Sequence, residues 1–349
     1  GDMTPSPRIQ PCVLAALLVL AVAGCVDDAT QTPAPDTGLQ DTGVQPQPVT
    51  EPGSYNIGYR TIEVTYTPEA YGESEPRTIP VSVWYPTNRE TGPPSTYLFI
   101  NRPEALSKVP IADGEFPVMV FSHGNGGLKE QSYFMSEHWA SHGWIVFSPD
   151  HIDNTFRTGT DIEIVSAVYR PQDINALIDR IHNVAADSFL SGNIGDFLAM
   201  SGHSMGAVTT LLVTGADIPV DDVASQCDVG RFDEASCDKL LTPERKELFR
   251  DGFLNERIDV SIPQAPGGAA LFQDGVADID IPTMMFTGGM DRTLPNDIEG
   301  DPLWQRMSGQ QHRRVNLPDA GHFTFSNMCD LLGGTERVDD DGCGEAFID

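Results

Sequence analysis

Lysine is scarce in this sequence. The 349 residues include only Lys108, Lys129, Lys239 and Lys246. The sequence has 21 lysines and arginines and 51 aspartates and glutamates, so the formal net charge is −30 at pH 7. Such a surface repels the phosphate backbone of nucleic acids and is not attracted by anionic lipid headgroups. The composition therefore argues against a nucleic-acid-binding protein and is typical of a well-hydrated exported one.

The amino-terminal region has no apolar run of full membrane-spanning length. Residues 13–23, which follow Arg8, have the length of a signal-peptide apolar region. They lead into "LAVAGC" (20–25), which resembles a bacterial lipoprotein signal. This resemblance implies cleavage before Cys25 and lipidation of Cys25, so that 1–24 are removed and the lipid anchors the protein to a membrane of the cell envelope. An ordinary cleavable signal and a buried core helix are the alternatives.

The next stretch lacks lysine, arginine and most large apolar residues. It reads "DDATQTPAPDTGLQDTGVQPQPVTEPG" (27–53). A segment of this composition buries too little surface to offset the entropy of ordering it. We therefore expect residues 25–53 to form a flexible tether and residues 54–349 to form a single catalytic domain.

Cysteine is also rare, and its positions agree with export. Cys12 lies in the expected signal peptide and Cys25 at the expected lipidation site. The four that remain are Cys227, Cys237, Cys329 and Cys343. They allow three pairings, of which the two local ones close short loops and fit an oxidising compartment. A four-cysteine zinc site is the alternative, but no C-x-x-C spacing supports it, and we expect no metal.

After residue 54 the sequence alternates between strand and helix patterns. Strand patterns occur at 59–67, 78–86, 116–124, 144–150, 196–202, 257–266, 281–289 and 312–322. Helical spacing occurs at 130–143, 170–185 and 205–215. This order predicts an α/β fold with a mostly parallel central sheet covered by helices on both faces. The charged segment 217–256 breaks the pattern, and we expect it to be an insertion that forms a cap or lid.

A candidate nucleophile lies in "SGHSMGAVTTLL" (201–212). Its inner residues fit G-x-S-x-G, a pattern that also arises by chance. Here, however, Ser204 follows a predicted buried strand and precedes a predicted helix, the context of a nucleophile elbow. Gly202 and Gly206 lack a Cβ atom and allow a tight turn. The Met205 N–H would then point toward a developing oxyanion. A simple packing turn is the alternative.

A serine hydroxyl needs a neighbouring base, and the base needs an acid that orients it. His322, in "DAGHFTF", follows the last predicted strand, and Asp291, in "FTGGMDRTLP", follows the strand before it. The order Ser, Asp, His is the one expected for an α/β-hydrolase. The alternative acids are Asp274, Asp278 and Asp280. We expect the histidines near the site, His123, His151 and His203, to shape loops through hydrogen bonds.

A second oxyanion donor is expected from "HGNGG" (123–127). Its glycines allow the backbone to approach a substrate closely. The N–H of Asn125 is the first candidate and that of Gly124 the second. A phosphate-binding loop is the alternative, but no Lys-Ser/Thr pair follows.

Several motifs together resemble the α/β-hydrolase superfamily, in particular its platelet-activating factor acetylhydrolase and dienelactone-hydrolase-like branch. They are "VSVWYP", "FSHGNGG", "SHGWIVFSPDH", "YRPQDI", "GHSMGA", "QAPGGAALF" and "DAGHFTF". The resemblance implies a serine esterase or lipase that acts on a small acyl or oxidised acyl ester. Cutinase-like polyester hydrolases share "GHSMG".

The sequence departs from that branch in two places. Dienelactone hydrolases have a cysteine at the position of Ser204. In the animal acetylhydrolases the acid follows the strand that matches 257–266, where this chain has Gln264 and Ala265. The acid is therefore expected from the next strand, as Asp291.

The sequence thus predicts an esterase that needs no cofactor and acts on small-molecule or lipid esters. A polyester hydrolase, and a serine peptidase or acyltransferase with the same triad, are the enzyme alternatives. A surface lipoprotein that only binds a ligand on an inactive hydrolase fold is the alternative from another class.

Overall fold

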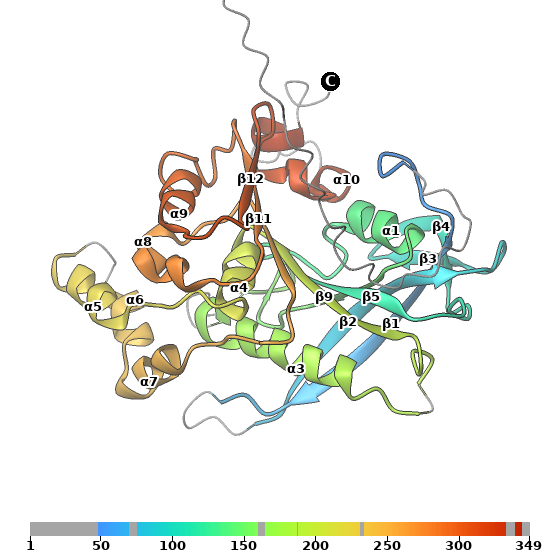
Figure 1. The fold of residues 1–349 in the computed structure, drawn as a ribbon, viewed down its shortest axis with the longest axis horizontal. Coiled ribbons are helices and arrows are strands. Elements are labelled where there is room, and N and C mark those ends of the chain that lie inside the picture. Colours follow the sequence, from blue (N-terminus) through green and yellow to red (C-terminus); the bar gives the residue numbers. More distant parts are fainter. Residues whose placement is uncertain are drawn as a thin grey trace, which may run out of the picture. The chain divides into compact units, whose positions relative to one another are not determined.

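A ten-stranded sheet runs through the described part of the chain (Figure 1). The computed structural model describes residues 48–69, 75–159, 165–186, 188–230, 234–332 and 339–343. In order across the sheet the strands are β12 (Arg313–Leu317), β11 (Met284–Gly288), β10 (Val260–Gln264), β9 (Ile194–His203), β5 (Phe116–Ser122), β6 (Ile145–Pro149), β2 (Arg77–Thr87), β1 (Asn56–Tyr66), β4 (Ile100–Ser107) and β3 (Pro94–Tyr97). The expected signal peptide, Cys25 and most of the expected tether lie outside the described residues.

The strand directions give the sheet its class. From β12 to β6 all neighbouring strands are parallel, whereas β2 is antiparallel to both β6 and β1. Because parallel strands end at the same edge, the loops that follow β5, β9, β11 and β12 meet there. The prediction of a mostly parallel, helix-covered α/β-hydrolase sheet is confirmed, and it places the loops with the candidate residues at one edge.

All eight predicted strands are present, but the sequence reading missed the β3–β4 hairpin. Its stretch contains Pro93, Pro94 and Pro103, and proline normally argues against a central strand. Pro94 lies on β3, the last strand of the sheet, and Pro103 of β4 is not paired in the register with either neighbouring strand, so these positions tolerate an absent N–H.

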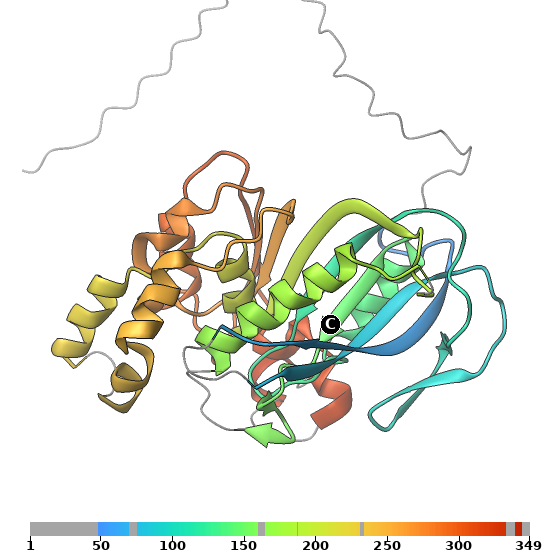
Figure 2. The same cartoon turned by 90° about the horizontal axis from the view of Figure 1, so that it is seen from below.

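Helices cover both faces of the sheet. α1 (Tyr133–Ser141) packs on one face, and α3 (Arg170–His182) and α4 (Met205–Val213) pack on the other. Figure 2 shows α3 lying across the sheet. Because side chains alternate along a strand, Val118 and Val120 of β5 join the core under α3 and α4, while Met119 joins the core under α1. This two-sided burial explains why the central strands are continuous apolar runs.

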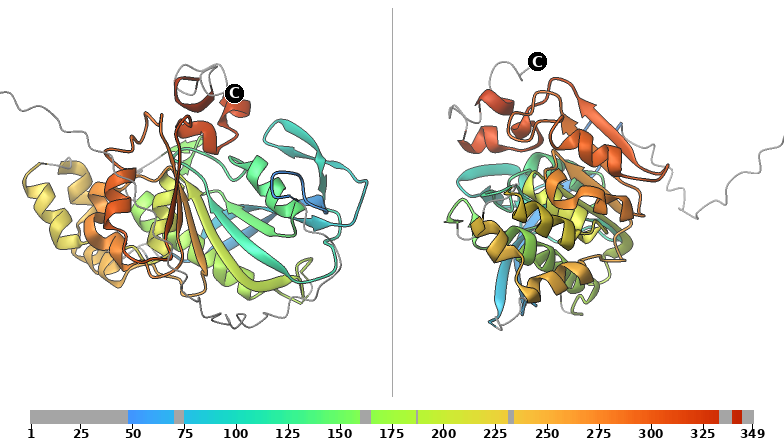
Figure 3. Two further views of the ribbon diagram at one scale, coloured as in Figure 1. Left: turned by 45° about the horizontal axis from the view of Figure 1, so that its top comes forward. Right: turned by 90° about the vertical axis from the view of Figure 1, so that its left-hand side faces the viewer.

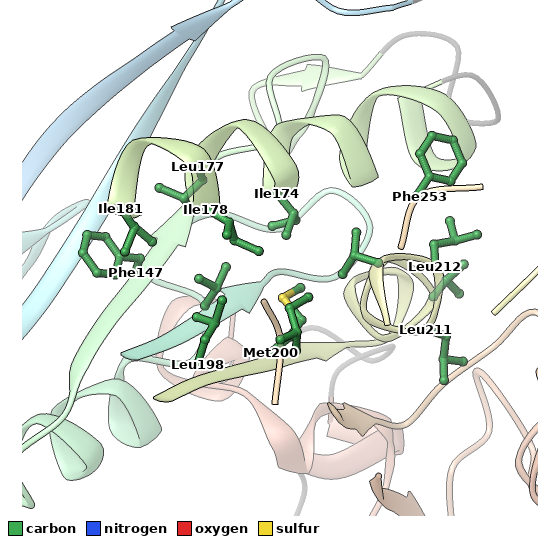
Figure 4. Packing of buried hydrophobic residues seen from close by; sticks show 14 of the residues in the cluster. Phe147, Ile174, Leu177, Ile178, Ile181, Leu198, Met200, Leu211, Leu212 and Phe253 are labelled. Atoms are coloured by element: carbon green, nitrogen blue, oxygen red, sulfur yellow. The ribbon is translucent and has the colours of Figure 1, made fainter. Parts of the chain in front are cut away.

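The larger core lies between α3, α4 and the sheet. In Figure 4 the side chains of Ile174, Leu177 and Ile181 on α3 face Leu198 and Met200 on β9. All five are buried. Complete burial of such a side chain stabilises the fold by about 1.5–3 kcal/mol. α3 therefore packs directly on β9, the strand that leads to Ser204.

The described residues of 217–256 form three helices. They are α5 (Val220–Asp228), α6 (Glu234–Leu240) and α7 (Pro243–Asp251). Val220, Val223, Leu248 and Phe249 turn inward and join the larger core. In the views of Figures 1 and 3 these helices lie at one side of the molecule, away from α10 (Met328–Leu332). The insertion thus packs against the flank of the domain.

Two disulfides close short loops, Cys227–Cys237 and Cys329–Cys343. These are the two local pairings, and they exclude the alternative of a four-cysteine zinc site. Disulfides persist in oxidising compartments, such as the periplasm or the cell exterior. Within the described ranges, no helix is both long and apolar enough to cross a membrane.

Candidate active site

Ser204 lies on a sharp turn between β9 and α4. Its backbone has φ 57° and ψ −119°, a conformation that is uncommon for a residue other than glycine. A Cβ atom at Gly202 would lie 2.2 Å from the carbonyl oxygen of Gly206, and one at Gly206 would lie 1.9 Å from that of Ser122. Only glycine fits at either position, so this local sequence places the half-buried Ser204 at the apex of a tight turn above the strand ends.

Two loops bring an imidazole and a carboxylate to Ser204. His322 begins η3 (His322–Phe325) after β12, and Asp291 follows β11. His322 Nε2 lies 2.9 Å from Ser204 Oγ, and His322 Nδ1 lies 2.8 Å from Asp291 Oδ2. Because a carboxylate only accepts, Nδ1 carries the proton and Nε2 is the acceptor for the serine hydroxyl. The structure thus brings together the three residues that the sequence predicted as a triad.

The orientation of Asp291 is fixed by its other oxygen. Oδ1 accepts the N–H of Leu294 at 2.7 Å, and the side chain is buried. The alternative acids lie elsewhere: Asp274 and Asp278 belong to η2 (Gln273–Asp278), and the carbonyl of Asp280 accepts from Gln311. None of these three carboxylates contacts His322.

The N–H groups of the two leading oxyanion candidates have no acceptor among the described residues. They belong to Met205, the first residue of α4, and to Asn125 in the loop after β5. The second oxyanion candidate, Gly124, was wrong, because its N–H donates to Gln131 Oε1 at 2.9 Å. The N–H groups of Met205 and Asn125, the two donors that the sequence analysis put first, therefore both remain free to bind an oxyanion.

A hydrogen-bond chain connects the three loops of the site. The N–H of Gly124 donates to Gln131, whose Nε2 lies 2.9 Å from His203 Nδ1. His203 Nε2 donates to the carbonyl oxygen of His322 at 2.8 Å. Burial, aided by the neighbouring His322, holds the pKa of His203 well below its usual range, so this imidazole stays neutral. The expectation that His203 shapes loops agrees with this geometry, whereas Gln131 was not foreseen.

Asp341, which the sequence reading also missed, ties the loops of Asp291 and His322 together. Its Oδ1 accepts the N–H groups of His322 and Arg292 at 2.9 and 3.0 Å. Its Oδ2 accepts the N–H and the hydroxyl of Thr293 at 2.8 and 2.7 Å. Burial alone would raise the pKa of Asp341, but the hydrogen bonds from His322, Arg292 and Thr293 outweigh it and lower the pKa. Asp341 is therefore an ionised anchor for both loops.

A cavity of about 480 Å³ opens beside Ser204. Its apolar side chains are Met205, Val208, Leu271, Leu294, Phe323 and Met328. Neither a carboxylate nor a lysine or arginine of the described chain lines it. No described residue of 217–256 lines it either, so the expected role of that segment as a cap or lid over the site does not fit its position. The cavity suits an uncharged ligand of small to medium size.

The comparisons with known proteins agree with an α/β-hydrolase fold. The sheet order, the elbow and the loop positions are those of an α/β-hydrolase. A family model described as Chlorophyllase matches residues 70–217, which is less than half of the chain. A ferulic acid esterase from Streptomyces cinnamoneus superposes with a TM-score of 0.59 at 16% sequence identity, covering 86% of this chain and 88% of that one. The search of curated proteins gave no match.

The class of the protein follows from these findings. It has an α/β-hydrolase fold, and the Chlorophyllase match over 70–217 indicates a carboxylic ester hydrolase. Its finer assignment rests on the residues around Ser204.

Proposed function

We propose that this protein is a serine hydrolase that cleaves carboxylic esters through an acyl-enzyme on Ser204. One observation carries the proposal. A continuous hydrogen-bond chain runs from Ser204 Oγ through His322 to Asp291, with distances of 2.9 and 2.8 Å. This chain ends at the wall of the cavity, which the nucleophile shares with Met205 and Asn125.

The reaction follows from the geometry in two halves. His322 Nε2 takes the hydroxyl proton as Ser204 Oγ attacks the ester carbonyl carbon. The N–H groups of Met205 and Asn125 stabilise the oxyanion. The tetrahedral intermediate collapses, the C–O bond to the alcohol breaks, and His322 gives its proton to the departing alcohol.

The second half returns the enzyme to its starting state. Water replaces the alcohol, loses a proton to His322 and attacks the acyl carbon. Collapse releases the carboxylic acid and restores the hydroxyl of Ser204. Asp291 stabilises the imidazolium in both halves and holds the tautomer that Ser204 requires.

The cavity indicates the type of ester. Its apolar side chains and the lack of described charged ones favour uncharged acyl and alcohol groups. We therefore propose short-chain or phospholipid-type esters whose charged parts remain outside the cavity. The ferulic acid esterase of similar fold adds aromatic acyl esters to the panel to be tested.

We also propose that the enzyme works outside the cytoplasm. Both disulfides and the acidic composition support this location. The "LAVAGC" motif supports a lipid anchor at Cys25, residues 25–53 as a tether and 54–349 as the catalytic domain. Labelling of cells with a radioactive fatty acid, with Cys25→Ala as the comparison, tests the anchor.

Steady-state kinetics on a panel of esters tests the reaction. The panel comprises p-nitrophenyl esters from acetate to octanoate, a phospholipid, a polyester film and methyl ferulate. Ser204→Ala should lower kcat by more than about ten-thousand-fold, and Asp291→Asn by about a thousand- to ten-thousand-fold. Ser201→Ala, on β9 three residues before Ser204, should stay within about threefold because its hydroxyl bonds the Ile262 carbonyl and no residue of the triad.

The same assay separates the alternatives. Turnover of anilides faster than of esters would indicate a peptidase. Preferential transfer to an added alcohol would indicate an acyltransferase. The absence of turnover with a folded wild-type protein would indicate a binding protein.

A further inference from the structure

A buried arginine lies directly beneath the loop that carries Asn125. Arg170, the first residue of α3, has no solvent exposure. Its guanidinium donates to the carbonyl oxygens of His123 and Gly124 at 2.7 and 2.9 Å. It also donates to Asn154 Oδ1, from Nε at 3.1 Å and from Nη2 at 2.7 Å. A buried cation is costly unless its donors are satisfied, and here backbone carbonyls of the site satisfy them.

Among the described residues, no carboxylate lies within ion-pair distance of Arg170. The nearby carboxylate of Asp173 pairs instead with Arg77 at 2.7 Å and with His151 at 2.8 Å. Burial lowers the pKa of Arg170 to about 9; the positive charge of Arg77 lowers it further, whereas the carboxylate of Asp173 raises it. The guanidinium is therefore still a cation at neutral pH. The positive charge of Arg170 therefore acts mainly on the loop carbonyls.

The planarity of the peptide bond turns this contact into an orientation. In a trans peptide the C=O and the following N–H point in opposite directions. Because Arg170 holds the carbonyl of Gly124 toward the protein interior, the N–H of Asn125 must point away from it, toward the cavity. The preceding peptide shows the same relation: Arg170 holds the His123 carbonyl, and the Gly124 N–H donates to Gln131 on the other side.

The Gly124 carbonyl receives two further donors. His123 Nδ1 lies 2.7 Å away, and the N–H of Gly127 donates at 3.1 Å. His123 Nε2 accepts the N–H of His151, so Nδ1 carries the proton of this imidazole. Burial, together with Arg170 and His151, holds the pKa of His123 well below its usual range, which keeps the ring neutral. Three donors on one amide oxygen polarise that amide and make its N–H a stronger donor.

We propose that Arg170 is a positioning residue of the oxyanion hole, which aims and polarises the Gly124–Asn125 peptide so that the Asn125 N–H stabilises the tetrahedral intermediate. This inference rests on the proposed acyl transfer at Ser204. Arg170 touches no reacting atom and acts through the peptide. Its loss should weaken binding of the oxyanion and leave binding of the ground-state ester nearly unchanged.

The test compares Arg170→Met with Arg77→Met. Arg77 is a second buried arginine of the same network, but it bonds Asp173, Asp153 and the carbonyl of Ile152 and does not contact the loop 123–127. For each folded variant we would measure kcat and KM for p-nitrophenyl acetate. We would also measure Ki for an aryl trifluoromethyl ketone, which forms an oxyanion when Ser204 adds to it.

The expected result separates the two variants. Arg170→Met should lower kcat by about ten- to hundredfold and raise Ki by a similar factor, with KM within about threefold. Arg170→Lys, which keeps a charge and some donors, should recover part of both losses. Arg77→Met should lower the melting temperature while kcat and Ki stay within about threefold.

Other outcomes decide against the proposal. It is wrong if folded Arg170→Met keeps the wild-type Ki, or if Arg77→Met raises Ki as much. If Arg170→Met does not fold, folded Arg170→Lys, which replaces the fork of guanidinium donors by one ammonium group, should raise Ki about threefold or more, and an unchanged Ki contradicts the proposal. If wild-type protein neither cleaves the ester nor binds the ketone, it is the proposed function that fails.

Discussion

Two segments of this molecule are closed by disulfides of similar loop length, yet they differ in what they hold. Cys227–Cys237, with a separation of 10 residues, joins α5 to α6 on the flank of the domain. Cys329–Cys343, with a separation of 14, joins α10 to the segment η4 (Asp339–Cys343). The first holds helices that do not line the cavity. The second holds the anchor of the two loops that carry Asp291 and His322.

The backbone of η4, the segment held by Cys329–Cys343, lies against the loop that carries His322. A Cβ atom at Gly321 would lie 2.6 Å from the carbonyl carbon of Asp341. Gly342 has φ +131°, and a Cβ there would lie 2.6 Å from the backbone nitrogen of Thr324. The two backbones therefore pack against each other without intervening side chains. The comparison teaches that the effect of a cross-link on activity depends on which backbone it immobilises.

The largest effect in this comparison is expected from Asp341→Ala. The change leaves the N–H groups of His322, Arg292 and Thr293 without their acceptor, at about 1–3 kcal/mol for each buried donor. We expect kcat for p-nitrophenyl acetate to fall by about ten- to hundredfold and the melting temperature to fall. Asp221→Ala on α5, an exposed carboxylate of the other segment, is the control and should change neither value. Equal activity of the two variants would show that Asp341 does not position the site.

The next effect is expected from removing the disulfide beside the site. A cross-link over a loop of this length stabilises a protein by about 3 kcal/mol. Cys329→Ser/Cys343→Ser should lower the melting temperature and also reduce kcat by about three- to tenfold, because η4 loses its attachment to α10. Kinetics at a temperature well below the melting point separates the two effects. Wild-type kcat in that variant would mean that the Asp341 hydrogen bonds suffice without the disulfide.

A smaller effect is expected from acid. The pKa of Asp341 is lower in the folded protein than its ordinary value of 3.8. Its carboxylate therefore stabilises the folded state fully above that value, and this stabilisation is lost as the pH falls through the lower folded value. Urea unfolding at several pH values should show that the stability difference between wild type and Asp341→Asn shrinks below about pH 3.8. A difference that stays constant down to pH 2 would contradict the assignment.

The smallest effect on activity is expected from the other disulfide. Cys227→Ser/Cys237→Ser should lower the melting temperature, because this disulfide closes a loop of similar length to the other one and restricts the unfolded chain to a similar extent. Its kcat and KM should remain within about twofold of wild type, since no described residue of 217–256 lines the cavity. A loss of activity as large as that of the Cys329 and Cys343 variant would remove the distinction between the two segments.

The fold and the three central residues could be predicted because their signals are local. Continuous apolar strands, amphipathic helices and the glycines around Ser204 are visible within short windows of sequence. The order of Ser204, Asp291 and His322 along the chain follows from the order of parallel strands whose ends share one edge.

The remaining features depend on backbone groups that meet only in the folded chain. Asp341 belongs to an acidic run in a chain of net charge −30, and its partners are mainly N–H groups from distant loops. The choice between Asn125 and Gly124 depends on which N–H is taken by Gln131, which no motif encodes. The described part of 217–256 packs on the flank of the domain through a few apolar side chains, such as Val223 and Phe249, which are hard to recognise in a mostly charged sequence.

Labelling with a fluorophosphonate, followed by mass spectrometry of the peptides, tests the central claim most directly. This reagent forms a stable adduct on a serine that is activated by a base. We predict one adduct per wild-type molecule, on the peptide that contains Ser204, with none in Ser204→Ala and much slower labelling in His322→Ala. An adduct on a different serine, or no adduct on a folded protein that still hydrolyses esters, would contradict the account.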